Sequence, residues 1–207
     1  MKKDFFKDSK IKFPAYEPWI SNDDQKIVMK TLGQSMLTLG PQLEKFETNF
    51  CKYTKAKYAV AVSNCTAALH LSLKALGIKK DDEVIIPDLT FVADANAVLA
   101  CNAKPIVTDI NKENFFLSIS NVKKNITKKT KAIIPVHIYG QVCNIEEILD
   151  VARDNDLKVI EDCAHAVGTF HNSKHVGNLG KTGCFSFYPT KNITTAEGGM
   201  VITNSKK

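Results

Sequence analysis

The sequence predicts an α/β fold in which helices cover both faces of a mostly parallel sheet. From residue 58 onward, short apolar runs alternate with stretches of helical periodicity. Strands that alternate with helices are typical of parallel sheets buried on both faces. The apolar runs are bounded by Gly, Pro, Asn or Asp, as expected for fully buried strands. We therefore expect a three-layer α/β/α sandwich with a mostly parallel seven-stranded sheet.

The residues before this alternating region are expected to form an arm and two helices. Residues 21–24 read Ser-Asn-Asp-Asp and can cap a helix that continues through residues 27–32. After a Gly-Pro turn, apolar residues at helical spacing predict a second helix over residues 42–53. We place the arm and its helices at residues 1–57 and one large domain at residues 58–207.

The large domain contains the seven predicted strands and the helices between them. The strands are expected at residues 58–63, 83–87, 105–109, 131–135, 157–161, 183–187 and 199–203. The helices are expected at residues 67–76, 91–100, 121–129 and 145–155. No internal repeat, low-complexity tract or linker divides this region. The chain ends just after the last strand without a closing helix, and we expect that it lacks a further domain.

The bulk composition indicates a globular protein and argues against several classes. Hydrophobic residues make up 44% and charged residues 24% of the 207 residues, which is ordinary for a soluble chain. The net charge is +6, but the lysines are scattered and no nucleic-acid partner is expected. No run reaches the ~20 apolar residues of a membrane span, and the N-terminus lacks the apolar core of a signal peptide. The six cysteines form no Cys-x-x-Cys pair, so we expect free thiols in the cytoplasm.

Polar residues that follow the predicted strands should meet in one crevice, because ligands bind outside the carboxyl ends of parallel strands. The first such segment, residues 63–68, leads from a strand into a helix. A helix start attracts phosphate through its free N–H groups and its dipole, and Ser63 and Thr66 add hydroxyl donors. Ordinary N-capping is the alternative. The glycine patterns of P-loop and dinucleotide-binding proteins are absent from the sequence.

Three further residues are candidates for the same crevice. Asp162 ends a predicted strand and needs a cationic or hydrogen-bonding partner, such as a protonated pyridine nitrogen or a structural ion pair. Lys191 follows a buried strand and is either a Schiff-base former or an exposed loop lysine. His165 is either a ligand contact or a satisfied core histidine. His171 and His175 lie among turn formers and not on a helix, so no metal site is expected.

In this order, the segments resemble the DegT/StrS-type sugar-nucleotide aminotransferases, which are similar in fold to aspartate aminotransferase. The run GCFSFYPTKN, with EDCAH upstream of it, is the most specific part of a resemblance that spans about residues 36–204. The resemblance implies a pyridoxal-phosphate-dependent transferase of fold type I, with a PLP-binding large domain at residues 58–207 and no C-terminal small domain. It also implies a homodimer.

The resemblance implies transfer of an amino group from an amino acid, commonly glutamate in this family's usual reaction, to a nucleotide-linked keto sugar for polysaccharide or glycan biosynthesis. Lys191 would form an imine with pyridoxal phosphate and shuttle a proton, and Asp162 would pair with the pyridinium nitrogen. Family members with His in place of this lysine act as dehydratases, so Lys191 favours transamination. A sugar dehydratase, a DNA-binding regulator and an inactive truncated relative are the alternatives.

The remaining implied residues hold the cofactor without reacting. Thr66, Ala67 and Ser186 are expected to contact its phosphate. Phe91 is expected to stack on one face of the ring. His165 is expected near the phenolic oxygen, at a position where many members carry Gln.

Overall fold

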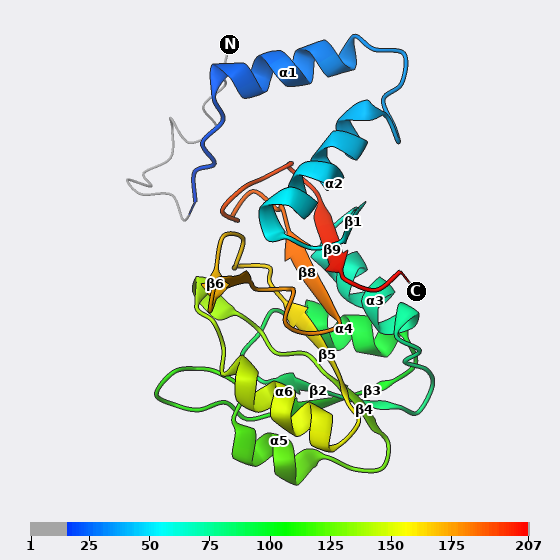
Figure 1. Ribbon diagram of the computed structural model, residues 1–207, viewed down its shortest axis with the longest axis vertical. Helices are drawn as coiled ribbons and strands as arrows, with labels where there is room; N and C mark the ends of the chain where they lie inside the picture. The colour runs from blue at the N-terminus through cyan, green and yellow to red at the C-terminus, as the bar shows by residue number, and fades with distance from the viewer. Residues whose placement is uncertain (1–15, 207) are drawn as a thin grey trace, which may run out of the picture.

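The computed structural model describes residues 16–206, and its α/β architecture confirms the predicted fold class (Figure 1). Seven strands form one sheet in the order β1-β9-β8-β5-β4-β2-β3. The strands are β1 (Tyr58–Val62), β2 (Glu83–Pro87), β3 (Lys104–Thr108), β4 (Thr130–Ile133), β5 (Lys158–Asp162), β8 (Thr182–Ser186) and β9 (Gly199–Thr203). Each of them begins and ends within two residues of a predicted run.

The sheet is mostly parallel, as predicted, and β9 runs against its neighbours. β9 pairs antiparallel with both β1 and β8, whereas β2, β3, β4, β5 and β8 pair in parallel. Gly199 at the start of β9 therefore pairs with Val62 and Ser186, the last residues of β1 and β8. The segment 187–198 that joins β8 to β9 consequently lies at the carboxyl edge of the parallel strands.

Helices form the outer layers. They are α1 (Asn22–Leu32), α2 (Pro41–Thr54), α3 (Cys65–Ala75), α4 (Ala93–Ala100), α5 (Ile119–Asn125) and α6 (Ile145–Asp154), with a short 3-10 helix η1 (Ile138–Gly140). Helices α3 and α4 pack on one face of the sheet, and α5 and α6 on the other (Figure 1). The result is the predicted three-layer sandwich.

Alternate residues of the central strands pack against opposite layers. Val84 of β2 belongs to the apolar cluster under α3 and α4, whereas the next residue, Ile85, belongs to the cluster under α5 and α6. A third cluster joins α2 to the sheet, where the ring centroids of Phe50 and Phe185 lie 5.1 Å apart. Since both faces are covered, the middle of the central strands is apolar on both faces.

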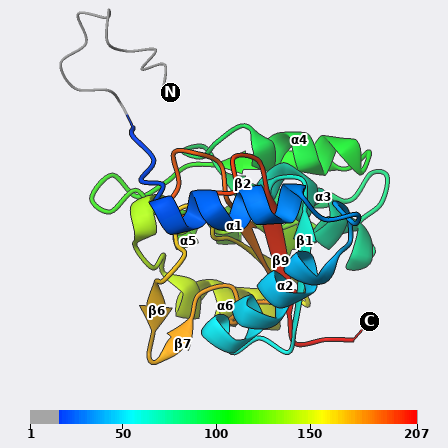
Figure 2. The same ribbon diagram turned by 90° about the horizontal axis from the view of Figure 1, so that it is seen from above.

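The N-terminal helix is capped as predicted but lies away from the sheet. Ser21 and Asp24 form a reciprocal capping box, in which each side chain accepts a hydrogen bond from the other residue's backbone N–H, at 3.1 and 2.9 Å. Helix α1 buries none of its residues. Figure 1 shows it separated from the sheet, and in the view from above it crosses in front of the strands (Figure 2). Residues 1–15 of the predicted arm lie outside the described residues. Within residues 16–206, no helix is both long and apolar enough to cross a membrane.

Several local predictions were wrong. The helix expected over residues 91–100 begins at Ala93, which leaves Phe91 in the preceding turn. The helix expected over residues 121–129 spans Ile119–Asn125. No strands were expected among the turn formers that begin at His171, but residues 170–175 form a hairpin of β6 (Phe170–His171) and β7 (Lys174–His175). Its two central residues have φ of 47° and 65°, the left-handed geometry that two-residue hairpins require.

Candidate active site

A cavity of about 660 Å³ lies at the carboxyl edge of the sheet. Its walls come from the turns after β1 and β2, from η1, from the end of β5 and from the segment between β8 and β9. Six of the seven predicted site residues line it: Thr66, Phe91, Asp162, His165, Ser186 and Lys191. Sheet topology brings these residues together from four segments that are far apart in the sequence.

The start of α3 forms one wall of the cavity. Asn64 is the N-cap, and its Oδ1 accepts a hydrogen bond from the backbone N–H of Ala67 at 2.8 Å. The Ala67 N–H is therefore engaged in capping, and Ala67 is not among the cavity-lining residues. The N–H groups of Cys65 and Thr66 have no acceptor within the helix, nor among residues 16–206, and they remain available for an anion.

A close approach of β9 fixes the shape of this wall. A Cβ atom at Gly199 would lie 2.5 Å from the carbonyl carbon of Asn64 and 2.8 Å from the nitrogen of Cys65. Only glycine allows the strand to approach the helix start at this distance.

Asp162 forms part of the cavity floor. Its side chain is almost fully buried, and Oδ1 accepts a hydrogen bond from the backbone N–H of Ala164 at 2.8 Å. Burial raises the pKa of Asp162, and the Ala164 N–H and the charge of Lys191 oppose that rise. A buried carboxylate with one backbone donor beside a cation can bind a further cationic group.

His165 presents a neutral imidazole to the cavity. The backbone N–H of Tyr139 donates to its Nδ1 at 3.2 Å, so the proton of the neutral ring lies on Nε2. Burial, and then the charge of Lys191, lower the pKa of His165. The Tyr139 ring stacks on the imidazole, with centroids 5.6 Å and planes 12° apart. Tyr139 has φ of 53°, a strained conformation for a bulky residue, and the sequence gives no signal of its part in the site.

Lys191 lies in a loop that is ordered by its own hydrogen bonds. Its backbone N–H donates to the carbonyl of Tyr188 at 2.9 Å, and the N–H of Phe187 donates to the carbonyl of Gly198 at 2.9 Å. The lysine side chain is half-buried and its charge acts on both Asp162 and His165. Tyr188 and Glu197 from this loop also line the cavity, although sequence reasoning did not identify them.

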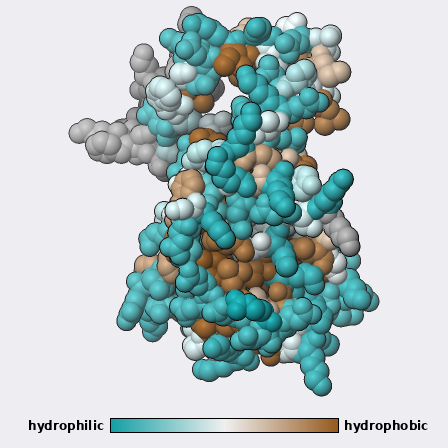
Figure 3. All heavy atoms as spheres, viewed as in Figure 1, coloured by the Kyte–Doolittle hydropathy of each residue, from teal (hydrophilic) through white to brown (hydrophobic). Residues whose placement is uncertain are grey.

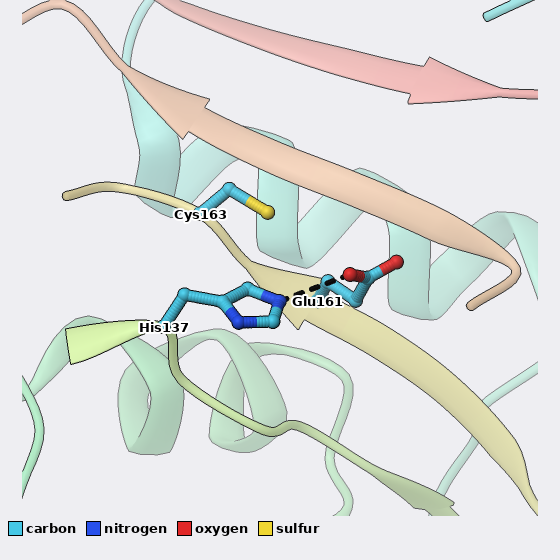
Figure 4. A group of neighbouring side chains, drawn as sticks. All are labelled: His137, Glu161 and Cys163. Atoms are coloured by element: carbon cyan, nitrogen blue, oxygen red, sulfur yellow. Dashed lines mark hydrogen bonds and ion pairs between the residues drawn. The ribbon is translucent and has the colours of Figure 1, made fainter. Parts of the chain in front are cut away.

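A buried cluster of His137, Glu161 and Cys163 lies next to Asp162 in the chain (Figure 4). The backbone N–H of Cys143 donates to His137 Nδ1 at 3.2 Å, so His137 donates through Nε2 to Glu161 at 2.9 Å. The Glu161 carboxylate also accepts three backbone N–H groups of residues 177–180, at 2.6 to 2.8 Å. Because the ring nitrogens and the carboxylate oxygens are engaged in hydrogen bonds, the arrangement fits a structural anchor better than a metal site.

Solved structures of other proteins share this fold. Spr1654 from Streptococcus pneumoniae in its PLP-form superposes with a TM-score of 0.90 at 30% identity, over 94% of this chain and 53% of that chain. ColD, named as a GDP-4-keto-6-deoxymannose-3-dehydratase, superposes with a TM-score of 0.88 at 28% identity, over 94% of this chain and 52% of that chain. Its structure was solved with GDP-perosamine bound.

Sequence comparison points the same way. A GDP-perosamine synthase from Vibrio cholerae is 44% identical over 193 residues, which cover 93% of this chain and 53% of the relative. The chain therefore spans about half the length of the curated relatives it matches. A family model described as the DegT/DnrJ/EryC1/StrS aminotransferase family matches residues 18–207. Sequence, fold and the residues gathered at the cavity agree, and the chain belongs to the DegT/DnrJ/EryC1/StrS aminotransferase family.

Proposed function

We propose that this chain is the cofactor-binding part of a pyridoxal-phosphate-dependent aminotransferase. The amino group would move from an amino acid, glutamate, to a nucleotide-linked keto sugar used in polysaccharide or glycan biosynthesis. The observation that carries this proposal is the placement of Lys191 and Asp162 in one cavity of a chain from this family. The name of the Vibrio cholerae relative supports a nucleotide sugar as the substrate.

The residues present fit pyridoxal phosphate. The free N–H groups at the start of α3, with the hydroxyls of Thr66 and Ser186, suit a phosphate. The buried carboxylate of Asp162 suits a cationic ring nitrogen, and the exposed ring of Phe91 at the cavity suits stacking on a flat ligand. A cavity of about 660 Å³ is within the range of cofactor sites.

Each side chain then has a distinct task. When bound, pyridoxal phosphate supplies an electron-accepting ring that stabilises negative charge on the carbon next to the transferred nitrogen. The Asp162 carboxylate would keep the ring nitrogen protonated, because a buried negative charge favours its cationic form. Lys191 Nζ would hold the cofactor covalently and, once released, would serve as a general base and acid. His165 carries its proton on Nε2 and would offer it to the phenolic oxygen.

A sugar dehydratase is the second candidate, and the structural likeness to ColD favours it. The resemblance associates dehydration with a histidine at the position of Lys191. The lysine present here therefore favours transamination, and product analysis separates the two reactions.

We also propose a homodimer in the cytoplasm. Ile27, Val28 and Leu32 of α1 are more than half exposed, and Figure 3 shows hydrophobic residues on the surface of this helix. A second copy of the chain would cover them, as contiguous exposed apolar residues mark interfaces.

The six cysteines are free thiols, which agrees with a reducing compartment. We retain residues 1–57 and 58–207 as the arm and the cofactor-binding domain.

The proposal is tested by adding pyridoxal phosphate to the purified chain, fixing any covalent bond with borohydride and mapping the labelled peptide. We expect one label, on Lys191, that is lost in Lys191→Ala. Lys181→Ala is the matched control, because Lys181 is exposed and lies outside the cavity. Attachment at another lysine, or none at all, would contradict the assignment. Mass spectrometry after addition of glutamate and nucleotide-linked keto sugars then identifies the aminated product.

A further inference from the structure

A second buried carboxyl group, Asp94, lies beside the cavity and has no task in the function proposed above. It stands in the first turn of α4 and is fully buried. Its chain neighbours Thr90 and Ala93 line the cavity. Sequence reasoning placed Asp94 inside an alanine-rich helix and assigned it no role.

Asp94 has fewer hydrogen-bond donors than the other buried carboxylates near the site. Glu161 accepts four hydrogen bonds. Asp162 accepts from the backbone N–H of Ala164 and, at 4.0 Å, from the Cys65 thiol, and it lies near the charge of Lys191. Asp94 has one donor, the Thr90 hydroxyl, which donates to Oδ2 at 2.6 Å. Its Oδ1 is buried, and no N–H or hydroxyl donor among residues 16–206 reaches it. An ionised carboxylate is poorly stabilised in such a place.

The groups that face Asp94 add no positive charge. Its nearest ionisable neighbours are Asp162 at the end of β5, Cys65 on α3 and Cys184 on β8. Burial, and then the charge of Asp162, raise the pKa of Asp94. Helix α4 also packs against β2 and β3, which are followed by the exposed Asp88 and Asp109 and so contribute only further acids.

The helix dipole acts in the other direction. Asp94 is the second residue of α4, where the partial positive charge of the helix start favours an anion. That effect is small compared with the desolvation of a carboxylate that has one hydrogen bond. Burial therefore decides the protonation state.

We propose that Asp94 is a neutral carboxylic acid at neutral pH and the positioning partner of Asp162. The two side chains together hold one proton and one negative charge. The proton stays on Asp94 and the charge stays on Asp162, which has the backbone donor of Ala164 and faces Lys191. The side chains of Asp94 and Asp162 are hydrogen-bonded to each other, and the proton on Asp94 supplies that bond, since two ionised carboxylates have no donor to share.

The pair concentrates the negative charge of the cavity floor on one side chain. A single ionised carboxylate, supported by a neutral acid behind it, can hold one cationic group without competing for its proton. The use of this charge toward a ring nitrogen depends on the proposed function. The protonation state of Asp94 does not, and it can be measured on the chain without cofactor.

The first test is infrared spectroscopy of the cofactor-free chain labelled with carbon-13 at its aspartate carboxyl groups. At pH 7 we expect the C=O stretch of a protonated aspartic acid, and we expect Asp94→Asn to remove it. Asp162→Asn should keep the band, because burial is the larger cause of the raised pKa of Asp94. Asp82→Asn should also keep it and is the matched control, since Asp82 is another buried aspartate that accepts a backbone hydrogen bond.

The outcomes separate cleanly. A band lost in Asp162→Asn but kept in Asp94→Asn would place the proton on Asp162 and overturn the proposal. The absence of any band at pH 7 would show that both groups are ionised and would also overturn it. If Asp94→Asn does not fold, a band that persists in Asp162→Asn and Asp82→Asn still supports Asp94.

A second test uses the pH dependence of stability. Burial raises the folded-state pKa of Asp94 above the ordinary value of 3.8, so the stabilisation by this group is full below that value and is lost as the pH rises toward the folded pKa. Asp94→Asn has no such loss, and its melting temperature should rise relative to the native chain between pH 4 and 7. If the melting temperature of Asp94→Asn minus that of the native chain stays flat or falls over this range, Asp94 is not neutral. A purely structural role of Asp94 would not produce the rise.

Discussion

Replacement of Glu161 by glutamine should destabilise the fold far more than its small change in size suggests. The Glu161 carboxylate is fully buried. Its Oε1 accepts from the N–H groups of Leu179 and Gly180, and its Oε2 accepts from the N–H of Gly177 and from His137 Nε2. Four donors on two oxygens satisfy the charge completely.

An amide has one oxygen, so its NH₂ group must face one of these two pairs of donors. His137 cannot become an acceptor at Nε2 without placing a proton on Nδ1, where the Cys143 N–H already donates. Two hydrogen bonds to a charged acceptor are lost in either orientation, each worth ~1.5 to 3 kcal/mol, which gives ~3 to 6 kcal/mol in all. A typical domain has a free energy of unfolding of ~5 to 15 kcal/mol.

Urea denaturation followed by circular dichroism measures this loss as a shift of the midpoint. Glu146→Gln is the matched control, because Glu146 also accepts from a histidine, His171 at 2.8 Å, but its side chain is 69% exposed. We expect the control to lose less than ~1 kcal/mol. If Glu161→Gln also loses less than ~1 kcal/mol, the buried hydrogen bonds are not what holds the turn at residues 177–180 to β5.

Three further predictions concern the site and its supports. Lys191→Ala should abolish the covalent cofactor band and reduce turnover at least ~10²-fold, the usual scale of a lost acid–base group, as measured by absorbance and product formation. Gly199→Ala should lower the free energy of unfolding by ~1 to 3 kcal/mol through overpacking, because its Cβ would lie 2.5 Å from the Asn64 carbonyl carbon. The shift of the urea midpoint measures this loss, and the affinity for pyridoxal phosphate should fall with it. Burial lowers the pKa of His175 below 6.5, and its Nε2 accepts from the Gly168 N–H at 3.0 Å. Its contribution to stability is therefore full above pH 6.5 and lost as the pH falls below it. The melting temperature of His175→Gln should be less sensitive to pH between 7 and 5 than that of the native chain, and equal sensitivity would contradict this.

The strands and the large helices were predictable because their signals are local. Each buried strand is a short apolar run bounded by turn residues, and the helix over residues 42–53 shows its apolar spacing directly. The hairpin at residues 170–175 was missed because its central Asn-Ser pair adopts left-handed φ without a glycine. The early end of α5 at Asn125 depends on the turn in which the N–H of Thr127 donates to the Thr130 hydroxyl at 2.9 Å, and helical periodicity does not reveal such a turn.

The site residues that lie at or just after the ends of strands were predictable. Thr66, Asp162 and Ser186 stand at strand ends, so the general geometry of parallel sheets brings them to one edge. Tyr139 and Asp94 depend on tertiary contacts. Tyr139 stacks on His165 from a turn in which it has a positive φ, and Asp94 is buried where α4 packs on the sheet. No spacing rule identifies either.

The two adjacent acids of β5 show what distinguishes a structural carboxylate from one available for binding. Successive residues of a strand face opposite sides of the sheet, so Glu161 meets the turn at residues 177–180 while Asp162 meets the cavity. Glu161 accepts four hydrogen bonds and has no capacity for a ligand, whereas Asp162 has one backbone donor and the charge of Lys191 nearby. As letters in the sequence the two acids are equivalent. Their hydrogen-bond partners separate them, since a buried carboxylate with unfilled acceptor capacity can bind a further cationic group.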